Sequence, residues 1–184
     1  MGSSRRQFVK TSAITLPFLV AGKVLFLSPA EAFAAQLPTQ LLSTTEVETL
    51  HVLAEAIVPG ARKAGIAHYI DKQLAAAAED SLLMLKYLGV PPPYAGFYQS
   101  GLASSVQLAK DRFEKPWAAL NQEQVGTLVD AIAQDNTPGW SGAPASFFFF
   151  VLRADATDVV YGTEEGFERI EMPYMAHIAP VENW

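Results

Sequence analysis

The chain has 184 residues, enough for one domain with a hydrophobic core and too few for two. Half of the residues are hydrophobic and 17% are charged, which excludes an intrinsically disordered chain. Cysteine is absent, so thiol catalysis, disulfides, cysteine-ligated zinc or iron–sulfur clusters and haem attachment through C-x-x-C-H are excluded within this polypeptide.

The net charge of −6 is unevenly distributed. Four basic side chains and one acidic one give residues 1–34 a charge of +3, which leaves −9 for residues 35–184. Affinity for nucleic acid depends on neutralising phosphates with Lys and Arg. The acidic remainder therefore argues against nucleic acid as a partner.

The N-terminus has the order of an export signal: a basic polar start, an apolar run from Ala13 to Leu27, and then small residues. Lys23 interrupts the run, which is shorter than the roughly 20 residues that cross a bilayer. The short run favours a cleaved signal. In the alternative, the signal is retained as an anchor and the chain is a membrane-anchored scaffold. We expect cleavage after Ala34, at Ala32-Phe33-Ala34, with Ala30-Glu31-Ala32 as the second choice.

Residues 4–10, Ser-Arg-Arg-Gln-Phe-Val-Lys, resemble the twin-arginine motif S/T-R-R-x-F-L-K except for valine at position 9, and the matching residues include Arg5, Arg6, Phe8 and Lys10. The resemblance implies export in the folded state, through the twin-arginine translocase, to the periplasm. That route is typical of proteins that acquire a cofactor or a cofactor-bearing partner before crossing. The alternative is an Arg-Arg pair ahead of an ordinary secretory signal.

The rest of the chain is predicted to be all-α. A capping box at residues 43–46 starts a helix that Pro59-Gly60 ends, and further helices are predicted over residues 66–88, over 97–114, and from Asn121 to the stop at 136–139. We divide the chain into a signal peptide at 1–34, a linker at 35–42, a helical domain at 43–162 and a C-terminal partner-binding tail at 163–184.

The apolar run over residues 147–152 could be a strand or a helix by periodicity alone. Pro144 suits a first helical turn, no second strand-like run is available for pairing, and helical spacing continues to Tyr161. This fifth helix is apolar all round its first two turns, so it lies either at the centre of the bundle or between the chain and a partner. The fold class is thus a small helical bundle of about five helices with an irregular C-terminal tail.

Catalytic chemistry is hard to find. His51, His68 and His177 lack a second histidine at metal-ligand spacing, and His51 is expected on the exposed side of its helix. The acidic residues at 155–168 lack the pattern of an EF-hand and are expected to be a solvated helix end. No G-x-G-x-x-G or P-loop occurs. We therefore predict no catalytic, cofactor-binding or metal-binding residue, and no enzyme activity by this chain alone.

The segments L-H-V-L-A-E-A-I-V-P at 50–59 and A-G-I-A-H-Y-I-D at 64–71 resemble the gluconate 2-dehydrogenase subunit 3 family. The ending at 173–180 resembles members paired with sugar or glucoside 3-dehydrogenases. The resemblance implies a small, non-catalytic subunit of an FAD-dependent sugar or sugar-acid dehydrogenase. FAD lies in a large subunit that commonly has no export signal, and a cytochrome c subunit carrying haem c often accepts the electrons. The small subunit supports export, maturation and stability of the large one.

In that role the aromatic helix and the tail are expected to make the contact, because aromatic and Met side chains are enriched in interface centres. The candidate interface residues are Phe147, Phe148, Phe150, Met172, Tyr174, Met175, His177, Ile178 and Trp184. His177 is a candidate to approach the partner's active site. The alternative function is a stand-alone exported domain whose phenylalanine helix lines a pocket for an apolar ligand.

Overall fold

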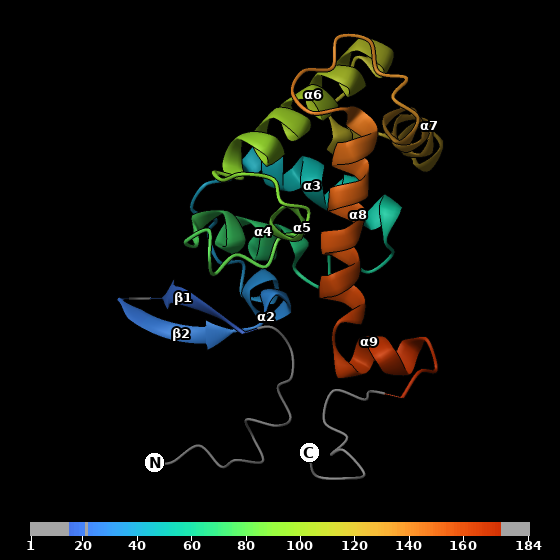
Figure 1. Ribbon diagram of the computed structural model, residues 1–184. Helices are drawn as coiled ribbons and strands as arrows, with labels where there is room; N and C mark the ends of the chain where they lie inside the picture. The colour runs from blue at the N-terminus through green and yellow to red at the C-terminus, as the bar shows by residue number, and fades with distance from the viewer. Residues whose placement is uncertain (1–14, 21, 174–184) are drawn as a thin grey trace, which may run out of the picture.

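The computed structural model describes residues 15–20 and 22–173 (Figure 1). An antiparallel hairpin comes first, with strands β1 (Leu16–Val20) and β2 (Lys23–Leu27). The helices that follow are α2 (Pro29–Ala34), α3 (Thr44–Ile57), α4 (Ile66–Ala75), α5 (Met84–Tyr87), α6 (Ala95–Phe113), the 3-10 helix η1 (Trp117–Ala119), α7 (Gln122–Ala133), α8 (Ala145–Tyr161) and α9 (Glu164–Arg169). Within this described part, five helices have ten or more residues, which confirms the predicted all-α bundle.

Local sequence signals set several helix ends as predicted. At the start of α3 the Ser43 amide donates to the Glu46 carboxylate at 2.7 Å, and the Glu46 amide returns a bond to the Ser43 hydroxyl. Asn121 and Gln124 form the same reciprocal capping box at α7. These bonds satisfy amides that have no partner inside the helix.

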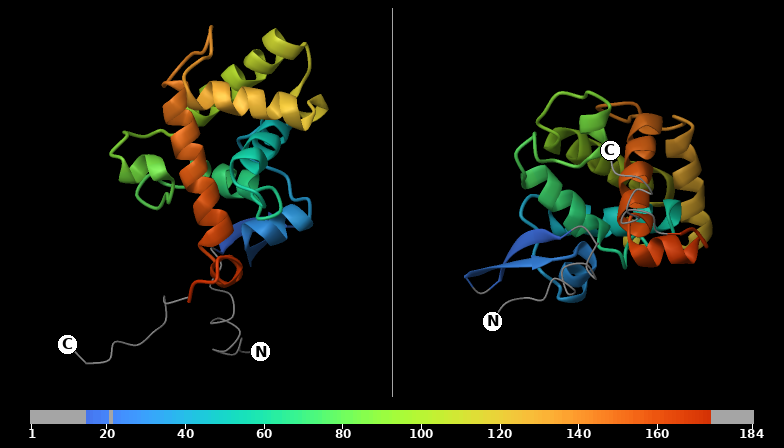
Figure 2. Two further views of the ribbon diagram at one scale, coloured as in Figure 1. Left: turned by 90° about the vertical axis from the view of Figure 1, so that its right-hand side faces the viewer. Right: turned by 60° about the horizontal axis from the view of Figure 1, so that its bottom comes forward.

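Helix α8 is the central element of the core. It runs from the end of the molecule where α6 and α7 meet to the end that carries α9 (Figures 1 and 2). Phe148 is 1% exposed and packs against the rings of Tyr98 and Trp140. Helix α6 approaches closely because Gly101 has no side chain: a Cβ there would lie 2.3 Å from the Phe148 ring. For Phe148, the core alternative is therefore correct.

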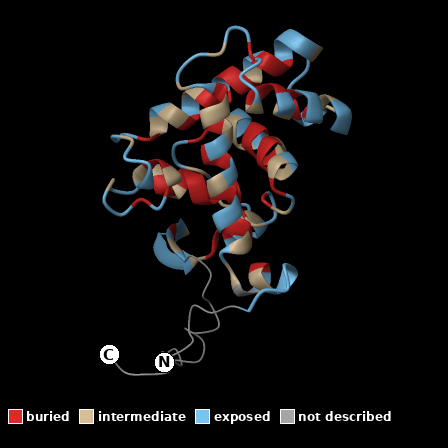
Figure 3. Cartoon of the chain, turned by 45° about the vertical axis from the view of Figure 1, so that its right-hand side comes forward, coloured by how far each residue is buried: buried red, intermediate tan, exposed pale blue. Residues whose placement is uncertain are grey.

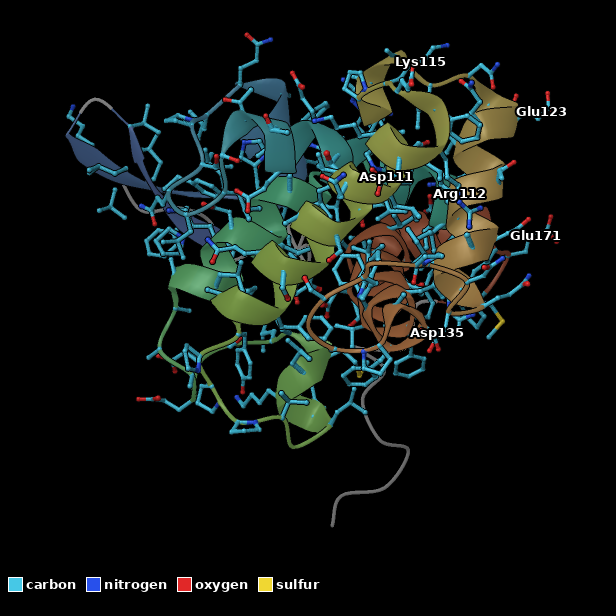
Figure 4. The ribbon with its side chains drawn as sticks, turned by 90° about the horizontal axis from the view of Figure 1, so that it is seen from above. Asp111, Arg112, Lys115, Glu123, Asp135 and Glu171 are labelled. Carbon is cyan, nitrogen blue, oxygen red and sulfur yellow. The ribbon has the colours of Figure 1, made fainter. Side chains whose placement is uncertain are left out.

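The loop before α8 is fixed at both ends, on the face shown in Figure 4. Arg112 of α6 donates to the Asn136 carbonyl at 2.7 Å. Asp135 accepts the Ser146 amide at 2.7 Å, and the Ser146 hydroxyl bond lowers the pKa of Asp135. The position of α8 is thus tied to α6 and α7 through this loop.

The predicted helix over residues 66–88 is wrong in its second half, which is a turn followed by the short α5. Long-range bonds override the helical propensity of the alanines: Leu82 donates its amide to the Gln73 side chain at 2.7 Å, and its carbonyl accepts from the Tyr69 hydroxyl at 3.2 Å. The tail is also less irregular than predicted, since Thr163 caps α9 through the Gly166 amide.

The apolar run predicted as the signal core contains the β1–β2 hairpin. Phe18 of β1 is buried, with the Lys72 ammonium 4.8 Å from its ring centroid. Leu19, Val24 and Phe26 are at least 60% exposed, and the hairpin is mostly pale blue in Figure 3. Among the residues that the structure describes, no helix has the length and apolarity needed to cross a membrane.

Two glycine variants test the packing of α8. Gly101→Ala forces a methyl group into the Phe148 ring, and we expect it to lower the free energy of unfolding by about 2 kcal/mol. Gly126→Ala is the matched control, because its Cβ meets nothing within 4 Å on an exposed helix position, and it should stabilise by roughly 0.5–1 kcal/mol. Urea unfolding curves measure both; equal effects would contradict this packing.

Candidate functional site

The loop between the family-like motifs, where α3 turns into α4, lies at the end of the molecule that also carries α2 and α9: a Cβ on Gly65 would meet Pro29, and one on Gly60 would meet Arg169. Glu55 accepts the backbone amides of Gly60 and Arg62, each at 2.9 Å. One carboxylate thereby closes the loop that follows α3. The motif glutamate has a structural role here, because both of its oxygens hold backbone.

Asp71, the last residue of the second motif, holds the linker. Its carboxylate accepts the amides of Gln40 and Leu41 at 2.8 Å and of Leu42 at 3.0 Å, and the side chain is 1% exposed. Three charge-assisted bonds to consecutive amides balance the cost of burying this acid. The segment that precedes α3 is thereby fixed on α4.

Gly65, in the same motif, permits a close approach by α2. Its φ is +82°, a left-handed conformation that favours glycine, and a Cβ would lie 2.0 Å from the Pro29 carbonyl oxygen. Helix α2 therefore sits with its first residue directly on the start of α4. This contact links the N-terminal segment to the motif.

The two histidines of this region are buried, so the expectation of a surface His51 is wrong. His51 is 7% exposed and His68 is 5% exposed, because α2 covers both: the Phe33 ring lies 5.3 Å from the His51 ring and 6.4 Å from the His68 ring. The His68 Nε2 donates to the Leu37 carbonyl at 2.8 Å. His51 Nε2 and His68 Nδ1 have no hydrogen-bond partner. No sequence pattern indicated this burial, because the covering segment has the pattern of a removable signal.

Asp155 also departs from its prediction as part of a solvated helix end, since it is fully buried on α8. It accepts the Met84 amide at 2.7 Å and a bond from the Tyr98 hydroxyl. Burial raises the pKa of Asp155 to about 6, although both hydrogen bonds act in the opposite direction. Its position seven residues after Phe148, on the same helical face, is the sequence signal that could have indicated burial. Asp158 and Glu165 are exposed, as predicted.

The candidate interface residues fall into three groups. Phe148 is in the core, so a partner cannot touch it without opening the bundle, and its assignment to an interface is corrected. Phe147 is half-buried, Phe150 is 41% exposed and Met172 is 55% exposed. The other candidates lie outside the described residues: Tyr174, Met175, His177, Ile178 and Trp184.

The described residues contain no group of three or more histidine, aspartate or glutamate side chains that could hold a metal ion. The carboxylates of Glu55 and Asp71 are occupied by backbone amides. What the arrangement can do is position chain segments. The β1–β2 hairpin, α2 and α9 all lie at this same end (Figures 1 and 2).

Two buried groups should give the stability a characteristic pH dependence. Burial, assisted by the charges of Arg62 and His68, lowers the pKa of His51 to about 4 from 6.5, so between these values the unfolded chain binds the proton and stability falls with acidification. Asp155, with its pKa raised to about 6 from 3.8, has the opposite sign: the folded chain binds the proton first, and stability rises with acidification.

We therefore expect Asp155→Asn to lose more free energy of unfolding than the parent between pH 7 and pH 5, and His51→Gln to lose less, each by about 1 kcal/mol. Urea unfolding of the full chain at several pH values measures this. Parallel profiles for the three proteins would contradict the burial of these groups.

Of three comparisons with known proteins, one finds a match. The family model for gluconate 2-dehydrogenase subunit 3 matches residues 44–177, which span α3 to α9 and reach beyond the described residues. No curated protein matches the chain. No solved structure matches it either. The matched region contains Glu55, Gly65 and Asp71, whose contacts build the end described above. The chain belongs to the gluconate 2-dehydrogenase subunit 3 family.

Proposed function

We propose that this protein is a non-catalytic small subunit of a periplasmic FAD-dependent sugar or sugar-acid dehydrogenase. The observation that carries the proposal is the family match over residues 44–177, since the family is that of a dehydrogenase subunit. The geometry agrees with an accessory role. The carboxylates of Glu55 and Asp71 in the family-like motifs accept backbone amides, as expected of residues with a structural role.

In this proposal the chemistry belongs to partner chains. FAD is bound by a large catalytic subunit, and a cytochrome c subunit with haem c receives the electrons. The small subunit carries the twin-arginine signal at Arg5 and Arg6, takes the folded large subunit through the translocase, and stabilises it afterwards. The complex is associated with the membrane through its partners.

The end of the molecule that carries α9 is the proposed contact with the large subunit. Ile170 is 48% exposed and Met172 is 55% exposed at the end of the described chain. Such side chains are costly to leave in water and are enriched at interface centres. The predicted contact residues from Tyr174 onward follow directly in the sequence.

Removing residues 174–184 tests the contact while leaving every described element in place. A stop after Pro173 should abolish co-purification of the large subunit, because the aromatic anchors are gone. The control replaces residues 174–184 by a Gly/Ser segment of equal length, which should fail equally if side chains rather than length matter. Unchanged complex yield in the truncated protein would contradict the tail contact.

The export route has its own test. Arg5→Lys together with Arg6→Lys preserves the charge and should stop export almost completely if the twin-arginine translocase reads the pair. Lys23→Arg, which also preserves charge but lies outside the motif, should export normally. Cell fractionation measures both; normal export of the double variant would indicate an ordinary secretory signal.

A further inference from the structure

The predicted processing bond, between Ala34 and Ala35, is exposed at the end of α2, but its backbone is held in a folded turn. The Ala35 amide donates to the Glu31 carbonyl at 2.9 Å, and the Leu37 amide donates to the Ala32 carbonyl at 3.1 Å. Ala32, the small residue expected to be read two positions before Ala34, is fully buried. A peptidase needs this segment extended and accessible, and the structure presents it as the end of a helix.

Residues 28–37, called the latch from here on, are held by contacts at each end. A capping box between Ser28 and Glu31 starts α2, with the Ser28 amide 2.7 Å from the Glu31 carboxylate. Pro29 rests on Gly65, and the Leu37 carbonyl accepts the His68 Nε2–H at 2.8 Å. The latch is therefore docked on α3 and α4.

We propose that the latch is an autoinhibitory contact: it holds the processing site folded, with Ala32 buried, in the precursor, and cleavage proceeds only through a state in which α2 has left α4. This inference rests on the proposed export signal. In the hydrolysis the C–N bond of Ala34–Ala35 breaks; water supplies hydroxyl to the Ala34 carbonyl carbon and a hydrogen to the Ala35 nitrogen. The external peptidase is the catalyst.

Processing would also change the surface at this end. Loss of residues 1–34 removes Phe33 from the faces of His51 and His68, whose free nitrogens have no partner while α2 is docked. The new N-terminus remains close by, because Asp71 still holds the amides of residues 40–42. The precursor and the processed protein thus present different surfaces next to the motif loop.

A pair of glycine variants separates the latch from backbone strain. Gly65→Ala places a Cβ 2.0 Å from the Pro29 carbonyl oxygen and should push α2 away, without altering the residues that a peptidase reads. Gly89→Ala is the control: its φ is +71°, so it shares the left-handed strain, but its Cβ meets nothing within 4 Å.

The full-length precursors are incubated with a bacterial signal peptidase in detergent micelles, and their helical content is checked by circular dichroism. We expect Gly65→Ala to be cleaved after Ala34 at least about tenfold faster than the parent and Gly89→Ala. Equal rates for all three folded proteins would overturn the latch.

A second measurement decides the matter even if Gly65→Ala does not fold. The chain has no cysteine, so Ala32→Cys can be labelled selectively, with the exposed Ala35→Cys as its control. Position 32 should react on the order of a hundredfold more slowly in the native precursor, and equally fast in urea. Equal native rates would overturn the docking.

A third experiment distinguishes a failure of the export proposal from a failure of the latch. A peptide of residues 24–40 has no domain to dock on and should be cleaved rapidly after Ala34. If the peptidase leaves this peptide intact, the processing site is wrong and the latch has no function in export. The subunit proposal would survive that outcome.

Discussion

Buried backbone amides must find acceptors, and in this chain buried or half-buried carboxylates supply them at the points where helices end. Glu55 closes the loop after α3, Asp71 fixes the segment before it, and Asp155 holds the start of α5. Each acid comes from a helix and bonds to backbone amides of a loop or, for Asp155, of the first residue of α5. Together with the hydrophobic core, these three carboxylates order α3, α4, α5 and α8, and within the described residues no sheet spans the bundle.

This use of the acids gives the family-like motifs a structural role. Glu55, Gly65 and Asp71 lie within the region that matches the family, and each serves the course of the backbone. A motif of this kind preserves a shape. The shape brings the N-terminal segment and α9 to one end of the molecule, as Figure 1 shows, and that end is where we propose export and partner binding meet.

The structural features that the sequence predicts correctly are those that depend on neighbouring residues. The capping boxes at Ser43 and Asn121 and the helical state of residues 145–161 follow from local spacing and were correct. The break after Ala75 was missed because it comes from bonds to Gln73 and Tyr69, which compete with a strong local helix signal.

The candidate site was less predictable than the fold, because its features depend on what covers them. The burial of His51 depends on Phe33, which belongs to a segment whose sequence indicates removal. Phe148 was placed at an interface because an all-round apolar helix leaves open which face meets the core. Only the packing of Gly101 against its ring decides that question.

We propose that this protein works as the small subunit of a flavin-dependent dehydrogenase. The most direct test is to isolate the tagged protein from the periplasm of its native cell and record the absorbance spectrum of whatever co-elutes. We expect a larger partner chain with the spectrum of bound oxidised flavin. A colourless protein that elutes alone would contradict it.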